Sequence, residues 1–271
     1  PTPAPELDPG AITNLSFPLK PARCDFAKRQ RPAGFKKSDA SYRSDKPMFS
    51  YVVTDVKVHS TASYAGHYYI IQFTCARSRY SKLYFLQSKT QMVFSLRSFL
   101  AWCKACGFSP KQVIIKSDAE AVYIGKNSEF RRACVENGIQ QVHSAPNIHE
   151  FNGMAEAKWK SVGSKARALM KQAGPSCTTD FWPYAYAYAN DLQNSTPHTQ
   201  NDYAIPHAVV FGKQRDLSGF RVFFSQCFSH VDGALRPAFG DRAKMGFFLG
   251  LDAESGAYRI LDPVTRRVYL R

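Results

Sequence analysis

The first part of the chain contains three runs in which β-branched and aromatic residues are interleaved with polar ones. These runs are residues 49–57 (FSYVVTDVK), 67–75 (HYYIIQFTC) and 79–87 (RYSKLYFLQ). Such composition and alternation are typical of β-strands. Because only short polar stretches separate the runs, we predict three strands that form an antiparallel meander.

Apolar positions change to helical spacing after these strands. Between residues 91 and 106 they show helical spacing, at Met92, Phe94, Leu96, Phe99 and Leu100, until Gly107 ends the run,. Short apolar strands then alternate with helices. The predicted elements are helix 91–106, strand 113–115, helix 127–137, strand 139–143, and helices 152–173 and 179–193. This order of elements indicates an α/β fold.

The last part of the chain has a different pattern. From about residue 212 it consists of short apolar segments separated by Gly, Pro and Asp. The predicted strands are 220–224, 227–231, 246–251, 257–261 and 267–270. Five short strands with tight turns favour a small β-barrel. The boundary before it is expected near residues 195–215, where Pro197, Pro206 and Gly212 interrupt the helical pattern,.

Composition narrows the class of protein. The 271 residues are 44% hydrophobic and 21% charged, which is a globular composition and excludes wholesale disorder,. The chain has no uninterrupted apolar run of about 18 residues, so we expect no membrane span,. Lys and Arg number 36 against 21 Asp and Glu, a net charge of +15. This excess favours a nucleic-acid partner over a merely basic soluble protein.

Basic residues are concentrated near the N-terminus. Residues 1–48 begin Pro-rich and lack hydrophobic periodicity, which predicts an extended basic arm; a disordered tail is the alternative,. We expect the arm to contact nucleic acid and other protein chains. The candidate nucleic-acid contacts in it are Lys28, Arg29, Arg31, Lys36 and Lys37.

Three acidic residues occupy positions that could converge. Asp55 lies in the first predicted strand, Asp118 just after the fourth, and Glu156 in the first turn of the long helix. Three close carboxylates suit two Mg²⁺ or Mn²⁺ ions, since these hard cations prefer oxygen ligands. The alternative is that each acid is an ordinary solvated residue at a strand or helix end.

The surroundings of these acids resemble the integrase of copia-type LTR retrotransposons, in the RNase H-like transposase and retroviral integrase superfamily. Asp55 stands in VVTDVKV, Asp118 in VIIKSDAEAVY and Glu156 in NGMAEAKWKSV. Further matches along the chain are 77–79 (RSR), Lys89, 166–170 (ARALM), Phe181-Trp182, Pro206, 211–212 (FG), 220–223 (FRVF), 246–251 (GFFLGL) and 262–268 (DPVTRRV).

The resemblance implies a fold and a division into domains. It implies an RNase H-like mixed five-stranded sheet flanked by helices, followed by a small SH3-like β-barrel. We therefore divide the chain into the arm (1–48), an integrase catalytic core (49–200), and a linker with the barrel (201–271).

The resemblance also implies an activity and the residues that perform it. The activity is two-metal phosphoryl transfer on DNA, in 3′-end processing and strand transfer. Asp55, Asp118 and Glu156 would be both the catalytic residues and the ligands of two Mg²⁺ or Mn²⁺ ions. Asn152, before Glu156, would orient the helix that carries Glu156 or touch the target DNA. The lysines after Glu156 would meet phosphates, although a solvated helix face explains them equally well; they are Lys158, Lys160 and Lys165.

Several positions depart from the family pattern. Asp118 is followed by Ala119-Glu120 in place of the family's Asn-Gly, and Glu156 by Ala157 in place of Arg. The N-terminal His-His-Cys-Cys module is absent apart from Cys24, so no zinc is expected,. These changes keep a second hypothesis open, a domesticated and inactive core that serves as a nucleic-acid-binding or structural subunit of a ribonucleoprotein. The first hypothesis predicts a nuclear protein; the second allows an organelle or a ribonucleoprotein particle, with RNA as partner.

Two other motifs favour ordinary structural roles. One motif, Trp102-Cys103-Lys104-Ala105-Cys106, resembles a redox motif. Redox chemistry requires such a motif at the start of a helix, whereas this one lies at the end of a predicted helix. We therefore expect free thiols. Trp182, Tyr184, Tyr186 and Tyr188 could stack on bases, yet helix packing is the simpler interpretation,.

Overall fold

The computed structural model describes residues 46–109, 112–118, 120–125, 127–143, 153–231, 236 and 238–271. Residues 1–45 of the predicted arm lie outside them, together with Lys28, Arg29, Arg31, Lys36 and Lys37. Asn152 lies outside them as well.

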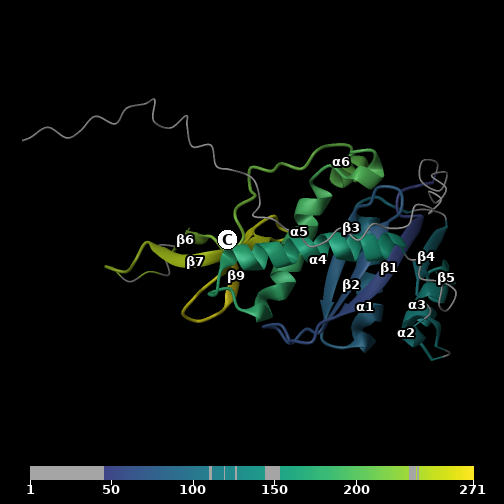
Figure 1. The fold of residues 1–271 in the computed structure, drawn as a ribbon, viewed down its shortest axis with the longest axis horizontal. Helices are drawn as coiled ribbons and strands as arrows, with labels where there is room; N and C mark the ends of the chain where they lie inside the picture. The colour runs from purple at the N-terminus through teal and green to yellow at the C-terminus, as the bar shows by residue number, and fades with distance from the viewer. Residues whose placement is uncertain are drawn as a thin grey trace, which may run out of the picture. The chain divides into compact units, whose positions relative to one another are not determined.

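A five-stranded sheet forms the centre of the described chain (Figure 1). Its strands are β1 (Tyr51–Val58), β2 (Tyr69–Cys75), β3 (Ser81–Leu86), β4 (Val113–Ser117) and β5 (Ile139–His143), in the order β3-β2-β1-β4-β5. β1, β2 and β3 pair antiparallel, whereas β1 with β4 and β4 with β5 pair parallel. The predicted meander and the mixed five-stranded sheet are confirmed.

Helices cover both faces of this sheet. They are α1 (Met92–Ala105), α2 (Ala121–Ile124), α3 (Glu129–Glu136), α4 (Gly153–Ala173), α5 (Trp182–Asn194) and α6 (Pro206–Phe211), with 3₁₀ turns η3 (Lys89–Gln91), η5 (Thr179–Phe181) and η6 (Thr199–Asn201). The four predicted helices are confirmed as α1, α3, α4 and η5 with α5. The sequence pattern missed α2 and α6, because helices of four and six residues are too short to show a period,.

Alternation along β2 assigns its side chains to the two faces. Ile71 and Phe73 belong to the core cluster that includes α1 and α3, whereas Ile70 belongs to the cluster that includes α4 and α5. Gln72 and Thr74 follow Ile70 at intervals of two and share its face, because successive strand residues point to opposite sides. Two buried polar residues thus face α4.

A second, four-stranded antiparallel sheet occupies the C-terminal part. Its strands are β6 (Gln226–His230), β7 (Ala243–Leu251), β8 (Tyr258–Leu261) and β9 (Val268–Leu270). The predicted strand at 220–224 is wrong. Phe224 has a φ of 62°, incompatible with a strand, and donates its backbone N–H to the Phe248 carbonyl at 2.7 Å,. The residues of this run form a turn instead, and the rings of Phe223 and Phe224 are buried in it.

Aromatic packing joins α5 to this C-terminal sheet. The Tyr188 ring meets the Phe248 ring edge-on, with centroids 5.4 Å apart. Tyr188 also donates its hydroxyl to the Arg221 carbonyl. Gly250 has a φ of 117°, and a side chain there would lie 3.3 Å from the Tyr188 ring. Tyr188 therefore lies between the helical layer and β7, which explains the aromatic character of α5 by packing.

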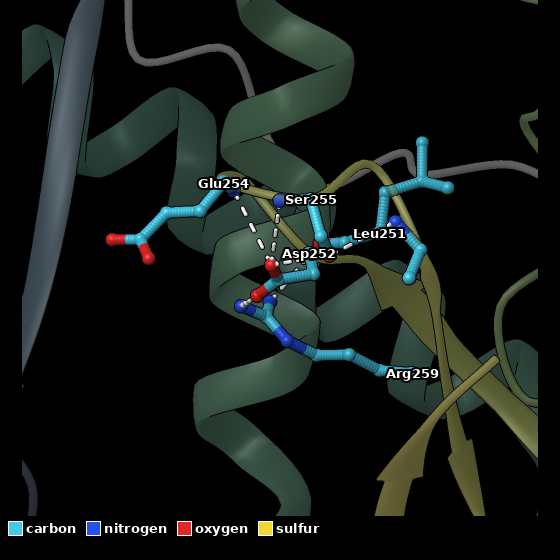
Figure 2. Close-up of polar contacts among 6 residues, drawn as sticks. Leu251, Asp252, Glu254, Ser255 and Arg259 are labelled. Carbon is cyan, nitrogen blue, oxygen red and sulfur yellow. Dashed lines mark hydrogen bonds and ion pairs between the residues drawn. The ribbon is translucent and has the colours of Figure 1, made fainter.

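The turn between β7 and β8 is organised by one carboxylate (Figure 2). Asp252 accepts hydrogen bonds from the backbone N–H and the hydroxyl of Ser255, and forms an ion pair with Arg259 at 2.7 Å. The backbone donor is the main reason that the pKa of Asp252 is lowered to about 2,. The turn is thus stabilised by the ionised form of Asp252.

Asp252→Asn is expected to lower the free energy of unfolding by about 1 kcal/mol at pH 7, after allowance for solvent screening. Since the pKa is lower in the folded state, the contribution is present above pH 4 and is lost as the pH falls toward 2,. Urea unfolding across this pH range measures it. The exposed Asp241→Asn is the control; an equal loss there, or a loss independent of pH, would contradict the account.

Candidate active site

The register between β1 and β4 brings two of the predicted acids together. In this parallel pair Val52 lies opposite Ile115 and Val53 opposite Lys116. Extending the register by two positions sets Asp55 level with Asp118, which directly follows β4. Asp55 on β1 therefore lies level with Asp118 at the end of the neighbouring strand β4, in the middle of the sheet.

The charge of Asp118 acts on Asp55. Burial raises the pKa of Asp55 to about 7, and the negative charge of Asp118 adds to the rise. Glu120 contributes in the same direction, while the backbone N–H of Val56, which donates to Asp55 at 2.8 Å, opposes it. Two mutually repelling carboxylates, one of them desolvated, are the usual oxygen donors for a divalent cation.

Glu156 lies in the first turn of α4, near the same strands. Gln72, the β2 partner of Asp55 in the register, donates from Nε2 to the carbonyl of Ala155 at 3.1 Å. This bond fixes the start of α4 against the sheet, one residue before Glu156. Gln72 is fully buried, so the contact is shielded from water,.

The structure does not bring Glu156 into a three-acid cluster. Within the residues that the structure describes, no group of three or more His, Cys, Asp or Glu side chains is arranged to hold a metal ion. The extended register sets Asp55 level with Asp118, and the role of all three acids as metal ligands stays a prediction. Residues 144–152, which precede α4 in sequence, lie outside the described residues.

Glu120 has a specific partner next to this site. Its carboxylate forms an ion pair with Lys89 at 3.0 Å, and both side chains are partly exposed. The same carboxylate adds to the rise in the Asp55 pKa. Glu120 thus increases the negative potential around the two aspartates while holding Lys89 at the rim.

The three candidate lysines of α4 lie in different surroundings. Lys160 is exposed and Lys165 is half-buried, so both can meet a polyanion. Lys158 is only 6% exposed. The helix turns Lys158 inward, toward a cavity that Thr74 of β2 also lines, and its contact with nucleic acid stays a prediction.

Two further residues near the site, Gln72 and Tyr123, were not predicted from the sequence. Gln72 interrupts the otherwise apolar run YIIQFTC, and a polar residue in a buried strand was the available signal. Tyr123 of α2 is fully buried, and its pKa is raised by burial and then by the charge of Asp55. No periodicity could reveal Tyr123, because α2 has only four residues.

The alternative motifs have structural explanations. Cys103 is buried in α1, and burial raises the pKa of its thiol to about 12, opposite to what redox chemistry needs,. The six described cysteines are free, as predicted. Trp182, Tyr186 and Tyr188 are buried packing residues, as expected.

None of the described helices has the length and hydropathy of a membrane span.

Comparison with known sequences supports the same interpretation. Residues 225–271 match the model of the Retroviral polymerase SH3-like domain. The chain is 26% identical over 246 residues to the Retrovirus-related Pol polyprotein from transposon TNT 1-94 of Nicotiana tabacum, covering 90% of this chain and 18% of that protein. It is 25% identical over 273 residues to the corresponding polyprotein from transposon RE1 of Arabidopsis thaliana, covering 99% and 18%. The chain thus spans less than a fifth of these relatives.

The chain was also compared with solved structures, and one of them shares the fold at a TM-score above 0.5. The simian T-cell lymphotropic virus intasome, in complex with PP2A regulatory subunit B56 gamma, aligns with 80% of this chain and 77% of its own at a TM-score of 0.51 and 12% identity. The HTLV-2 integrase catalytic core domain, in complex with magnesium, aligns with 62% of this chain and 99% of its own at a TM-score of 0.45 and 13% identity.

The fold is that of an integrase core followed by an SH3-like segment. The resemblance to a retrotransposon integrase is confirmed by the similarity to Pol polyproteins.

Proposed function

We propose that the chain is an integrase-type polynucleotidyl transferase that processes and joins DNA ends with two Mg²⁺ or Mn²⁺ ions. The observation that carries the proposal is the position of Asp55 on β1, level with Asp118 directly after the parallel strand β4. The two carboxylates repel each other and one is desolvated, so their oxygens suit a divalent cation. Bound there, such ions supply Lewis-acid stabilisation of the attacking and leaving oxygens.

The chain's own residues have distinct tasks in this proposal. Asp55 and Asp118 hold the metals, and Glu156 completes the ligand set from α4. Gln72 fixes the start of α4, which keeps Glu156 near the sheet. The exposed Lys160 and the net charge of +15 attract the DNA backbone,.

DNA is the partner in this proposal, and the basic arm adds contacts to DNA and to other protein chains. A nuclear location follows from an activity on chromosomal DNA. The arm residues Lys28, Arg29, Arg31, Lys36 and Lys37, together with Asn152, belong to the proposed DNA-contacting set.

The second candidate is an inactive core retained as a nucleic-acid-binding or structural subunit, with RNA as a partner and an organelle or ribonucleoprotein particle as its location. It is favoured by one observation, the absence of a three-acid group among the described residues. In this candidate the basic surface is used and the carboxylates are not.

The experiment is a strand-joining and cleavage assay on a fluorescent branched DNA, with Mn²⁺, with Mg²⁺ and with chelator. The proposal expects products only with a divalent ion. Salt-sensitive binding of DNA or RNA without any product would exclude it in favour of the second candidate.

A further inference from the structure

A cavity of about 200 Å³ lies between α4 and the β2–β3 turn, apart from the Asp55 and Asp118 pair. This volume is ample for a phosphate-sized anion. Among the described residues, the polar ones that line it are Thr74, Arg79, Lys158, Ser161, His198 and Thr199. Three of these carry a basic group, and none of these carries an acid.

Lys158 is the central feature of this cavity. Its side chain is more than nine-tenths buried, and its Nζ has no hydrogen-bond partner within the described part of the chain. Thr74, which is 1% exposed, also lines the cavity with an unpartnered hydroxyl. Buried polar groups are normally hydrogen-bonded, so two donors left open at one cavity indicate a missing acceptor.

The charges around Lys158 also favour binding of an anion at this cavity. Arg79 and Lys165 are the charged groups that act on Lys158, and both are positive. His198 is under the influence of the same three cations. Within the described residues, neither Lys158 nor Lys165 forms an ion pair with a carboxylate. The local field therefore favours an anion.

The turn that carries Arg79 is held in place before any ligand binds. Arg79 has a φ of 62° and donates its N–H to the Cys75 carbonyl at 2.9 Å. Asn194 of α5 accepts from the Ser81 N–H at 3.1 Å and donates to the Ser81 carbonyl at 2.9 Å. Asn201 donates to the Ser78 carbonyl at 3.3 Å. These bonds on both sides of Arg79 preorganise the cavity.

We propose that this cavity binds one phosphate group, held by Lys158, Arg79 and the Thr74 hydroxyl. The group comes from inorganic phosphate or from a nucleic-acid backbone, since both present the same oxygens. The site stands independently of the proposed activity, because it uses neither Asp55 nor Asp118.

The test measures thermal unfolding of the full chain in metal-free chloride buffer, with and without inorganic phosphate at matched ionic strength. Phosphate is expected to raise the midpoint by about 3 °C or more. Lys158→Met, similar in size and uncharged, is expected to raise the midpoint in chloride and to abolish the phosphate increment. The exposed Lys171→Met, in the last turn of α4, is the matched control and should keep the increment.

A second arm distinguishes the source of the phosphate group. A short DNA duplex replaces inorganic phosphate, again without metal. Stabilisation by the duplex alone, lost in Lys158→Met and kept in Lys171→Met, assigns the site to a nucleic-acid backbone. An increment that persists in Lys158→Met, or no increment with either probe, would overturn the proposal. None of these readouts requires strand joining, so failure of the proposed function would leave them unchanged.

Discussion

Asp118→Asn is expected to lower the rate of Mn²⁺-dependent strand joining by about a thousandfold, on the order of 4 kcal/mol of transition-state stabilisation. Asparagine keeps the shape of the side chain but supplies no charge to hold a divalent ion. DNA affinity should be retained, because the change removes a negative charge next to the DNA. The rate is measured in single-turnover assays on the branched substrate, with binding measured separately.

Glu120→Gln is the matched control for this loss. Glu120 lies two residues further along the same loop, and its carboxylate is paired with Lys89 at 3.0 Å. We expect the Glu120→Gln rate to stay within about threefold of the wild type, since a partly exposed ion pair contributes little. A large loss in Glu120→Gln combined with full activity in Asp118→Asn would reject the assignment of the metal ligands.

Asp55→Asn is expected to stabilise the metal-free protein by about 2–4 kcal/mol at pH 8. The pKa of Asp55 is raised to about 7 in the folded state, mainly by burial. The folded chain therefore holds this proton more tightly than the unfolded chain, and its stability falls as the pH rises from about 4 through 7. Asparagine has no such penalty, and it can still accept the Val56 N–H.

Denaturant unfolding at pH 5 and pH 8, in chelator and then in Mg²⁺, measures this difference. The advantage of Asp55→Asn should be large at pH 8 and small at pH 5. Mg²⁺ should stabilise the wild type and leave Asp55→Asn unchanged. The exposed Asp202→Asn serves as control. An advantage equal at both pH values would show that Asp55 is not a desolvated, ionised carboxylate at pH 8.

Long periodic elements were the predictable part of the fold. Strand 139–143 coincides with β5, and the helix predicted at 152–173 differs from α4 by one residue. In these segments the apolar positions of the sequence are the ones buried by the fold, so the hydrophobic pattern alone is sufficient to predict the element. The run at 220–224 is apolar as well, but its residues are buried as a turn, and hydrophobicity does not distinguish the two.

The site depended on information that no local pattern contains. Asp55 and Asp118 meet because β1 pairs with β4, a strand order that the alternation of residues does not specify. The inward position of Lys158 could not be predicted either, since lysines are rarely buried and only the packing of α4 on β2 turns this one inward.

Tyr188 and Gly250 bear on how such a chain can change over evolutionary time. Because the α5 ring is covered by β7, and Gly250 leaves the space that this ring needs, the two parts must be compatible residue by residue. A C-terminal segment taken from a distant relative would bring a mismatched surface to α5. The core and its C-terminal sheet are therefore expected to be inherited together, and grafts between lineages should fail unless both sides of this contact are transferred.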